Sequence, residues 1–572
     1  MPQGGDPVSG PRLKPILKSA LKGTFAVALG LLTLMATAAA PTEKASTALA
    51  QGERMYREGI LPSGEPMQAV VSGDVPVAGT AFTCVSCHLR GGLGSWEGGI
   101  VTLATNGARL AQPRYWKFPN LSPEERKELR LQNPPARPAY TDEALAHVLR
   151  TGIDLGGREL HPIMPRYYLK DPDMALLIKY LRSLSAQLSP GVDATTIRFA
   201  TVITDEVSPE DQQAMLVPMN NYLARHNAQP SGFGNRMYLN IGGQEMSGAF
   251  RSLSLSVWRL KGAPETWRAQ LEAYLAKEPV FALLGGISYR DWKPIHAFCE
   301  ARKLPCLLPL TDLPVVSGTD WYTQYFSKGY YQEGQAAARY LRSLEDATAT
   351  RRIIQIIQDG PEARALATGF RETWNELGQG GVTDILLGRG EPVTPGGLRT
   401  LLEKERPTAV LLWTGAGAFE ALEGLADWAD RPASAFMSSR LLGAKVYALP
   451  ERARTFTWFT YPYRAPEEEP QVSKYANSLL AGLATHRPET RISTRTYDLL
   501  QIFQAALMDM DRNIYRDNFL DRVSMQRDQV LPDYLRLSFG PGQRYASKGC
   551  FLMQLSPGPE PRLIRKSEWV IH

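Results

Sequence analysis

Between residues 197 and 460 the sequence alternates short apolar runs with longer amphipathic stretches, and few fold classes accommodate such a pattern. The apolar runs have the length of strands, and the stretches between them repeat their apolar residues at helical spacing. Strands that alternate with helices are typical of parallel sheets covered by helices, which is an α/β architecture. The segment 196–572 is too long for one small sheet, so we expect two lobes.

The same periodicity places the individual elements. The predicted strands are 197–204, 237–241, 280–284, 306–310, 353–358, 384–387, 409–413 and 455–460, and the predicted helices are 209–226, 264–277, 291–302, 331–345, 361–377, 396–405 and 417–428. The sequence lacks a G-x-G-x-x-G after a strand, a G-K-[ST] phosphate loop and a G-x-S-x-G nucleophile turn. These absences argue against the common nucleotide-binding and hydrolase members of the α/β class.

The charge balance argues against a nucleic-acid partner. The chain has 64 basic and 58 acidic side chains, a net charge of +6 over 572 residues. A nucleic-acid-binding chain needs a much stronger basic excess or a clustered basic patch.

The N-terminus has the pattern of a secretory signal. Four basic residues and no acidic residue lie within 12–22, and an uncharged run of small and apolar residues follows over 23–40. This order predicts a signal peptide over 1–40. The run is also near the lower length limit for spanning a bilayer, so a retained N-terminal anchor stays open. In both cases we expect the rest of the chain to be exported to the periplasm.

The motif that most directly indicates a cofactor is Cys84-Val85-Ser86-Cys87-His88. This C-x-x-C-H spacing is the attachment signature of c-type haem, in which Cys84 and Cys87 form thioethers and His88 is an axial ligand of the iron. A zinc site would need further Cys or His at ligand spacing, and none is near. A redox dithiol would need a strand before the motif and a helix after it, whereas the flanking residues are loop-like. We therefore predict one haem c per chain.

The second axial ligand is predicted to be Met164. The candidates downstream are His147, His161, Met164 and Met174. Met164 lies between two prolines, which stiffen the loop that would hold its thioether. Met174 lies on the apolar face of a predicted helix, where core packing explains it. His161, three residues from Met164, and an open iron position remain alternatives.

The order of these features resembles a monohaem class I cytochrome c. The segment 45–188 contains, in that family's order, a leading helix at 46–58, the motif at 84–88, a Met-Pro-x-Tyr loop at 164–167 and a final helix at 171–184. The resemblance implies an all-α domain that transfers single electrons. The long stretch 59–83 departs from the family and predicts an insertion or a hairpin.

The remaining two-thirds resembles a type I periplasmic binding protein of the branched-chain amino acid class. The resemblance is carried by 279–289, 304–312, 325–326, 332–344, 353–378 and the closing stretches 537–544, 551–555 and 568–570. It implies two lobes with a ligand cleft at the carboxyl ends of the strands. The residues that it places there are Ser288, Thr311, Asp312 and Thr414. Gly360-Pro361 stands where amino acid binders of the family usually have Tyr-Gly, which argues against an amino acid ligand.

Two further features bear on the organisation of the chain. Ser189-Pro190-Gly191 follows the last predicted cytochrome helix, so we assign 189–195 to a linker and 196–572 to the two-lobed module. Cys299 and Cys306 are close enough in sequence for a disulfide in an oxidising compartment, and two buried free thiols are the alternative.

The sequence thus predicts a multidomain fold, an all-α cytochrome domain followed by a two-lobed α/β module. The expected function is one-electron transfer in the periplasm through a single haem, with a periplasmic dehydrogenase or oxidase as the redox partner. The fused module would bind a small molecule or serve as a docking surface. The alternative is a substrate-binding protein for transport or sensing with haem as a redox sensor. A haem enzyme with open iron is a third, less favoured reading, so the sequence favours a carrier or binding protein over an enzyme.

Overall fold

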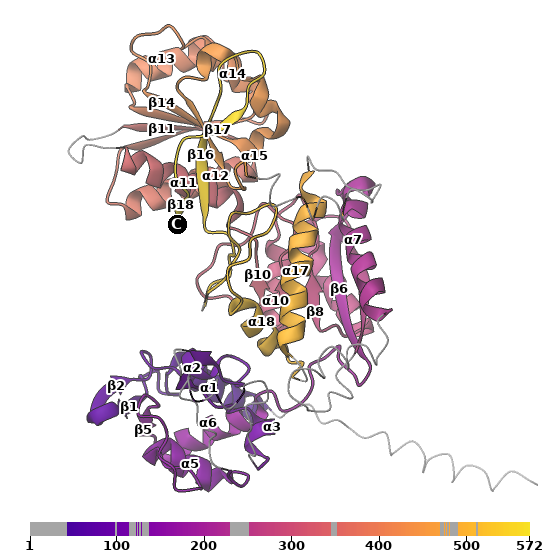
Figure 1. Cartoon of the computed structure of the whole chain (residues 1–572). Helices are drawn as coiled ribbons and strands as arrows, with labels where there is room; N and C mark the ends of the chain where they lie inside the picture. Colours follow the sequence, from indigo (N-terminus) through magenta and orange to yellow (C-terminus); the bar gives the residue numbers. More distant parts are fainter. Residues whose placement is uncertain are drawn as a thin grey trace, which may run out of the picture.

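The computed structural model describes residues 43–571 except 98–99, most of 114–135, 229–250, 345–351, most of 469–489, 511–512 and 541. Figure 1 shows three bodies: a mainly helical N-terminal unit and two α/β lobes. Among the helices in this part of the chain, none combines the length and apolar character needed to cross a membrane. The predicted signal segment 1–40 lies outside the described residues.

The N-terminal unit is built around two crossing helices. Its elements are α1 (Glu43–Glu58), β1 (Gln68–Val71), β2 (Val75–Ala78), α2 (Cys84–His88), β3 (Trp96–Glu97), β4 (Ile100–Val101), α3 (Gly107–Leu110), α5 (Asp142–Thr151), β5 (Arg166–Tyr167) and α6 (Asp171–Ser183). Helix α1 packs on α6 at Gly52, where a β-carbon would lie 2.4 Å from the carbonyl oxygen of Leu176. Only glycine therefore permits this close approach of the two backbones.

The all-α expectation for this unit needs correction. Strands β1 and β2 form an antiparallel hairpin, and β5 pairs with β1 to make a three-stranded sheet. The hairpin falls within the stretch 59–83, where the sequence predicted an insertion or a hairpin. Its turn is fixed from outside, because the amide of Ser72 donates to the carbonyl of Pro162 at 3.0 Å.

Lobe I has a five-stranded parallel sheet in the order β7-β6-β8-β9-β10. The strands are β6 (Thr196–Thr204), β7 (Ser252–Leu260), β8 (Ala282–Leu284), β9 (Cys306–Leu307) and β10 (Thr323–Gln324), and the helices are α7 (Pro209–Asn227), α9 (Trp267–Lys277), α10 (Lys293–Ala301), α17 (Ile492–Met510) and α18 (Arg516–Ser524). Helices α17 and α18 come from the C-terminal part of the chain, yet they pack beside the early elements of this lobe (Figure 1).

Lobe II repeats the strand order of lobe I and adds antiparallel strands at one side. Its parallel strands follow the order β12-β11-β13-β14-β15, and β16 pairs antiparallel with β15. The strands are β11 (Ile353–Gln358), β12 (Val382–Leu387), β13 (Ala409–Trp413), β14 (Ser434–Ser438), β15 (Thr457–Tyr461), β16 (Gly549–Leu555), β17 (Leu563–Arg565) and β18 (Val570–Ile571), and the longer helices are α11 (Gly329–Ser343), α12 (Pro361–Glu376) and α13 (Pro395–Glu405), with the short α14 (Phe419–Glu423) and α15 (Ser439–Leu442).

The chain passes between the lobes three times. The crossings lie between Phe326 and Tyr330, between Ala465 and Ile492, and between Ala546 and Phe551, as the members of each lobe's core show. The predicted two-lobed α/β architecture is therefore confirmed.

Several predicted elements differ from the observed ones. Strands 353–358 and 409–413 match residue for residue, but β7 and β14 were not predicted. Strand β7 alternates Ser with apolar residues because it is the edge strand of its sheet and is only partly buried. The predicted strand 237–241 lies outside the described residues, and 537–544 takes part only in an isolated bridge.

The predicted linker, residues 189–195, is packed against lobe I. A β-carbon on Gly191 would be 2.2 Å from the amide nitrogen of Phe281. The amide of Arg516 donates to the Ser189 hydroxyl at 3.0 Å. The segment is a packed connection and not a free spacer.

Backbone contact between α11 and α12 generates a stability prediction. A β-carbon on Gly334 would lie 2.0 Å from the carbonyl oxygen of Leu366, so Gly334→Ala forces the helices apart. We expect a loss of about 1–3 kcal/mol in the free energy of unfolding, as for other overpacked cores. Chemical denaturation measures it. Gly396→Ala is the control, because no atom lies within 4 Å of its β-carbon position in α13; equal effects of the two variants would contradict the prediction.

Candidate functional site

The C-x-x-C-H motif forms the short helix α2 in the N-terminal unit. Cys84 is buried, Cys87 is exposed, and the His88 side chain points into the unit with 7% of the residue exposed. The Sγ atom of Cys84 is 3.8 Å from the hydroxyl of Tyr167, which also donates to the carbonyl of Phe82 at 3.2 Å. One turn of helix thus places both thiols and the imidazole along one short segment.

The imidazole of His88 is arranged as a metal ligand would be. Its Nδ1 lies 2.8 Å from the carbonyl oxygen of Leu103, and a carbonyl can only accept, so Nδ1 carries the proton. Nε2 then holds the free lone pair. Burial lowers the pKa of His88, although the bond to Leu103 opposes the shift, and the ring is therefore neutral at pH 7.

The Nε2 atom of His88 is the unexplained group of this unit. It is buried and has no hydrogen-bond partner among the described residues. Leaving such an atom buried and unpaired is unfavourable unless something absent from the polypeptide satisfies it. Iron-ligating histidines show the same arrangement, in which the other ring nitrogen donates to a backbone carbonyl. The residues present therefore fit a haem iron.

The predicted second ligand lies on a loop beside the same core. Met164 is half-buried and packs against the cluster that contains Cys84 and Tyr167. Its amide donates to the carbonyl of His161 at 2.8 Å, while the His161 side chain is exposed. Met174 is 2% exposed in the core on α6. Across the described ranges, no group of three or more His, Cys, Asp or Glu residues could hold a metal ion on its own.

A second candidate site lies between the lobes. An open hollow of about 200 Å³ is lined by residues after β8 and β9, by the first crossing and by the start of α12: Asp291, Asp312, Leu313, Pro314, Lys328, Tyr331, Pro361 and Ala365. It therefore lies at the carboxyl ends of strands from lobe I, where α/β proteins bind ligands. Burial lowers the pKa of Lys328, while Glu376 opposes that shift.

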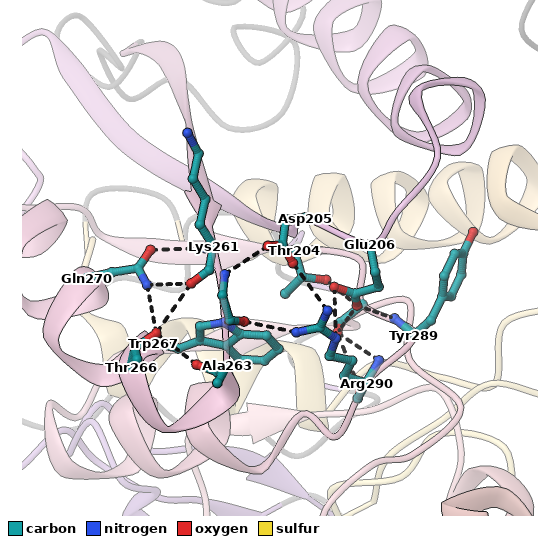
Figure 2. A network of polar contacts seen from close by, with 12 residues as sticks. Thr204, Asp205, Glu206, Lys261, Ala263, Thr266, Trp267, Gln270, Tyr289 and Arg290 are labelled. Carbon is teal, nitrogen blue, oxygen red and sulfur yellow. Dashed lines mark hydrogen bonds and ion pairs between the residues drawn. The ribbon is translucent and has the colours of Figure 1, made fainter.

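Donor groups at the end of β8 are taken by a carboxylate of the protein itself. Glu206, just beyond β6, accepts through Oε1 from Thr204 Oγ1 at 2.6 Å, from Ser288 Oγ at 3.0 Å and from the amide of Tyr289 at 3.1 Å. Arg290 lies 3.5 Å from Glu206 and from Asp205, and Figure 2 shows it between these carboxylates and the segment from Lys261 to Ala263.

Beside the hollow, Asp312 joins the two lobes through buried guanidinium groups. Its Oδ1 is 3.0 Å from Arg440 of lobe II and 3.3 Å from Arg495 of α17, whose side chains are only 5% and 7% exposed. Burial raises the pKa of Asp312, but Arg440 and Arg495 outweigh it and hold the pKa below its ordinary value. Arg440 also lies 3.4 Å from Glu333, which is bonded to Ser438 and Thr460.

Of the four predicted ligand residues, only Asp312 lines the hollow. Ser288 is bonded to Glu206, and the Thr311 hydroxyl accepts from the amide of Leu313 at 3.1 Å. Thr414 is 2% exposed at the end of β13 in lobe II. Two residues of this region were not predicted from the sequence. Glu206 could have been noticed as an acidic residue directly after a buried strand, and Lys328 as a single basic residue at a crossing between lobes.

The remaining cysteines, Cys299, Cys306 and Cys550, are buried. Cys299 lies on α10 and Cys306 begins β9, and burial together with the neighbouring Cys306 thiol raises the pKa of Cys299 well above its ordinary value. A disulfide between them stays a prediction.

Comparison with known proteins gives structural similarity alone. The two-lobed part is similar to an ABC transporter substrate-binding protein from Sphaerobacter thermophilus (14% identity, 66% of this chain and 98% of that chain, TM-score 0.46). It is also similar to a solute-binding protein from Rhodopseudomonas palustris in complex with p-hydroxybenzoic acid (15%, 66% and 97%, TM-score 0.45) and to a leucine-binding protein from Thermotoga maritima (13%, 65% and 98%, TM-score 0.42). No family model and no curated protein matches the sequence.

The Asp312 cluster generates a second prediction. Asp312→Asn leaves Arg495 buried without its ion-pair partner and Arg440 with Glu333 alone, and breaking a buried pair in this way costs about 3–5 kcal/mol. Because the Asp312 side chain is itself 33% exposed, we expect the free energy of unfolding to fall by about 3 kcal/mol, the low end of this range. Chemical denaturation measures this loss. Asp291→Asn is the control, because Asp291 also lines the hollow but forms no ion pair among the described residues. Equal stability of the wild type and Asp312→Asn would contradict the bridging role.

Proposed function

We propose that the chain is a periplasmic, two-lobed ligand-binding protein that carries one covalently attached haem c on its N-terminal unit. The observation that carries the haem assignment is the neutral, buried His88, with its Nδ1–H bonded to Leu103 and its Nε2 unpaired within the described residues. The interlobe hollow supports the binding assignment.

In this proposal four residues of the N-terminal unit hold the haem. Cys84 and Cys87 would supply the two thioethers, and His88 would supply a nitrogen ligand to the iron. Met164, on its proline-flanked loop beside the same core, would supply a sulfur ligand. The bound haem would supply reversible one-electron chemistry, and a Met–His pair raises its reduction potential relative to two histidines. Leu103 keeps the His88 ring in one tautomer and one orientation.

The interlobe hollow favours a ligand without a free carboxylate. Ser288 and the amide of Tyr289 are the natural anion donors at the end of β8, and Glu206 already occupies both. Asp291 adds a negative charge to the lining and Lys328 a positive one, while the carboxylate of Asp312 is already paired with Arg440 and Arg495. Neutral polar or cationic small molecules therefore suit this lining better than anions do.

A second candidate is an electron carrier whose two lobes form a docking scaffold for a redox partner, such as a periplasmic dehydrogenase or oxidase. The observation that favours it is the Asp312–Arg440 ion pair, which already bridges the lobes beside the hollow. Side chains of the protein itself therefore already link the two lobes there without a ligand.

Haem attachment gives the first test. Purified exported protein is expected to carry one covalent haem, measured by mass and by resistance to extraction with acidified solvent. His88→Ala should lose the low-spin spectrum. Met164→Ala should lose the weak far-red band of a sulfur–iron bond and lower the potential, whereas His161→Ala should keep both. Haem that extracts freely would contradict attachment, and loss of the low-spin spectrum in His161→Ala would move the ligand to His161.

Ligand binding gives the second test. A ligand that binds only the folded lobes stabilises them by mass action and so raises the melting temperature. At a ligand concentration of a hundred times Kd, the free energy of unfolding increases by about 2.7 kcal/mol. We expect shifts with small alcohols, amines or other neutral and cationic compounds, and weaker ones with organic acids. Glu206→Gln should change this preference toward acids, with Asp205→Asn as the neighbouring control. The absence of any shift across the screen would favour the docking scaffold.

A further inference from the structure

The chain directly after His88 is held by a side chain that lies far away in the sequence. We call residues 89–92 the post-motif loop. The amide of Arg90 donates to Asp521 Oδ1 at 3.2 Å, and the amide of Gly91 donates to Asp521 Oδ2 at 2.8 Å. Asp521 belongs to α18 of lobe I and is 4% exposed. The carboxylate of Asp521 in lobe I therefore accepts hydrogen bonds from two successive amides of the post-motif loop.

The post-motif loop needs such a hold because its backbone is strained. Leu89 has φ 62° and ψ 172°, a region that is favourable only for glycine. A side-chain-bearing residue stays in this region only when its surroundings fix the chain on both sides. Tyr56 donates to the carbonyl of Leu89 at 2.7 Å, and Asp521 fixes the next two amides. The strained residue directly adjoins His88.

The rest of the interface brings α18 firmly against the N-terminal unit. Asp517, one turn before Asp521, pairs with Arg57 of α1 at 2.8 Å and accepts from Tyr322 at 3.0 Å. The Arg90 guanidinium lies 4.3 Å from the ring centre of Trp321 in lobe I. A β-carbon on Gly91 would be 3.2 Å from the amide nitrogen of Asn518, so the loop and the helix are in close contact.

We propose that Asp521 is a positioning residue for the haem, one that fixes the post-motif loop and through it the orientation of His88. This inference rests on the proposed haem attachment. It makes lobe I part of the haem site, because Asp521 of lobe I fixes the backbone next to His88 while Leu103 holds the His88 ring. The buried negative charge also favours the oxidised iron, which carries one more positive charge than the reduced iron.

The test compares Asp521→Asn with Asp517→Asn in the full-length protein. Asn is neutral and has one acceptor oxygen, so it cannot accept from the two amides through separate charged oxygens as Asp521 does. The Arg90 and Gly91 amides should therefore exchange with solvent about tenfold faster, the effect of losing one charge-assisted hydrogen bond. The potential should rise. It is measured at about pH 8.5, where the wild-type carboxylate is ionised, since burial raises the pKa of Asp521 to about 7. Asp517→Asn should leave both amides protected and shift the potential less.

A second variant keeps the test decisive if Asp521→Asn fails to fold. Gly91→Ala retains the carboxylate but pushes a methyl group toward the Asn518 backbone, so it should also speed exchange at Arg90 and Gly91. Wild-type exchange in the Asp521 and Gly91 variants, or faster exchange in Asp521→Asn with an unchanged potential, would overturn the positioning role. Absence of covalent haem from the wild type would instead refute the proposed haem attachment. The hydrogen exchange of the Arg90 and Gly91 amides would still show whether Asp521 fixes the post-motif loop.

Discussion

Lobe I depends on apolar contacts between segments that are almost three hundred residues apart. Strand β6 and helix α7 bury their apolar side chains against α17, α18 and the residues up to 546, and all of them belong to one core. Phe199 packs edge-on against Phe503 at 5.2 Å between ring centres, and Phe281 packs against Phe519 at 5.6 Å. Neither the lobe nor the surface that it offers to the N-terminal unit is complete without the returning segment. The three crossings between lobes follow from this requirement.

Local patterns explain which parts of this structure could be predicted from the sequence. Strands 353–358 and 409–413 are continuous apolar runs because they are buried on both faces, and such runs are recognisable without any partner. The C-x-x-C-H motif is likewise local, since its two thiols and its histidine lie within five residues. Helix α17 was missed because it carries apolar residues on several sides and lacks a clear amphipathic period. Its role is set by where it packs.

The candidate ligand residues show the limit of the same reasoning. The sequence places Ser288, Thr311 and Asp312 at strand ends, which is where they lie, but it does not reveal their partners. Glu206 reaches Ser288 from another strand, and Arg440 and Arg495 reach Asp312 from another lobe and another helix. A side chain at a strand end is available to a ligand only if the fold leaves it unpaired, and pairing is a property of tertiary contacts. Asp521 was not predicted for the same reason, because its partners Arg90 and Gly91 are brought to it only by the tertiary structure.

The late position of α18 in the chain has a consequence for how the protein is made. Synthesis proceeds from the N-terminus, so the segment 84–88 emerges more than four hundred residues before Asp521. During that interval the N-terminal unit has no α18 to contact, and its post-motif loop lacks the acceptor for two amides. If haem is attached to Cys84 and Cys87 as proposed, attachment at that stage would act on a loop that still lacks this acceptor. Docking of lobe I then supplies Asp521 and completes the contacts of the post-motif loop.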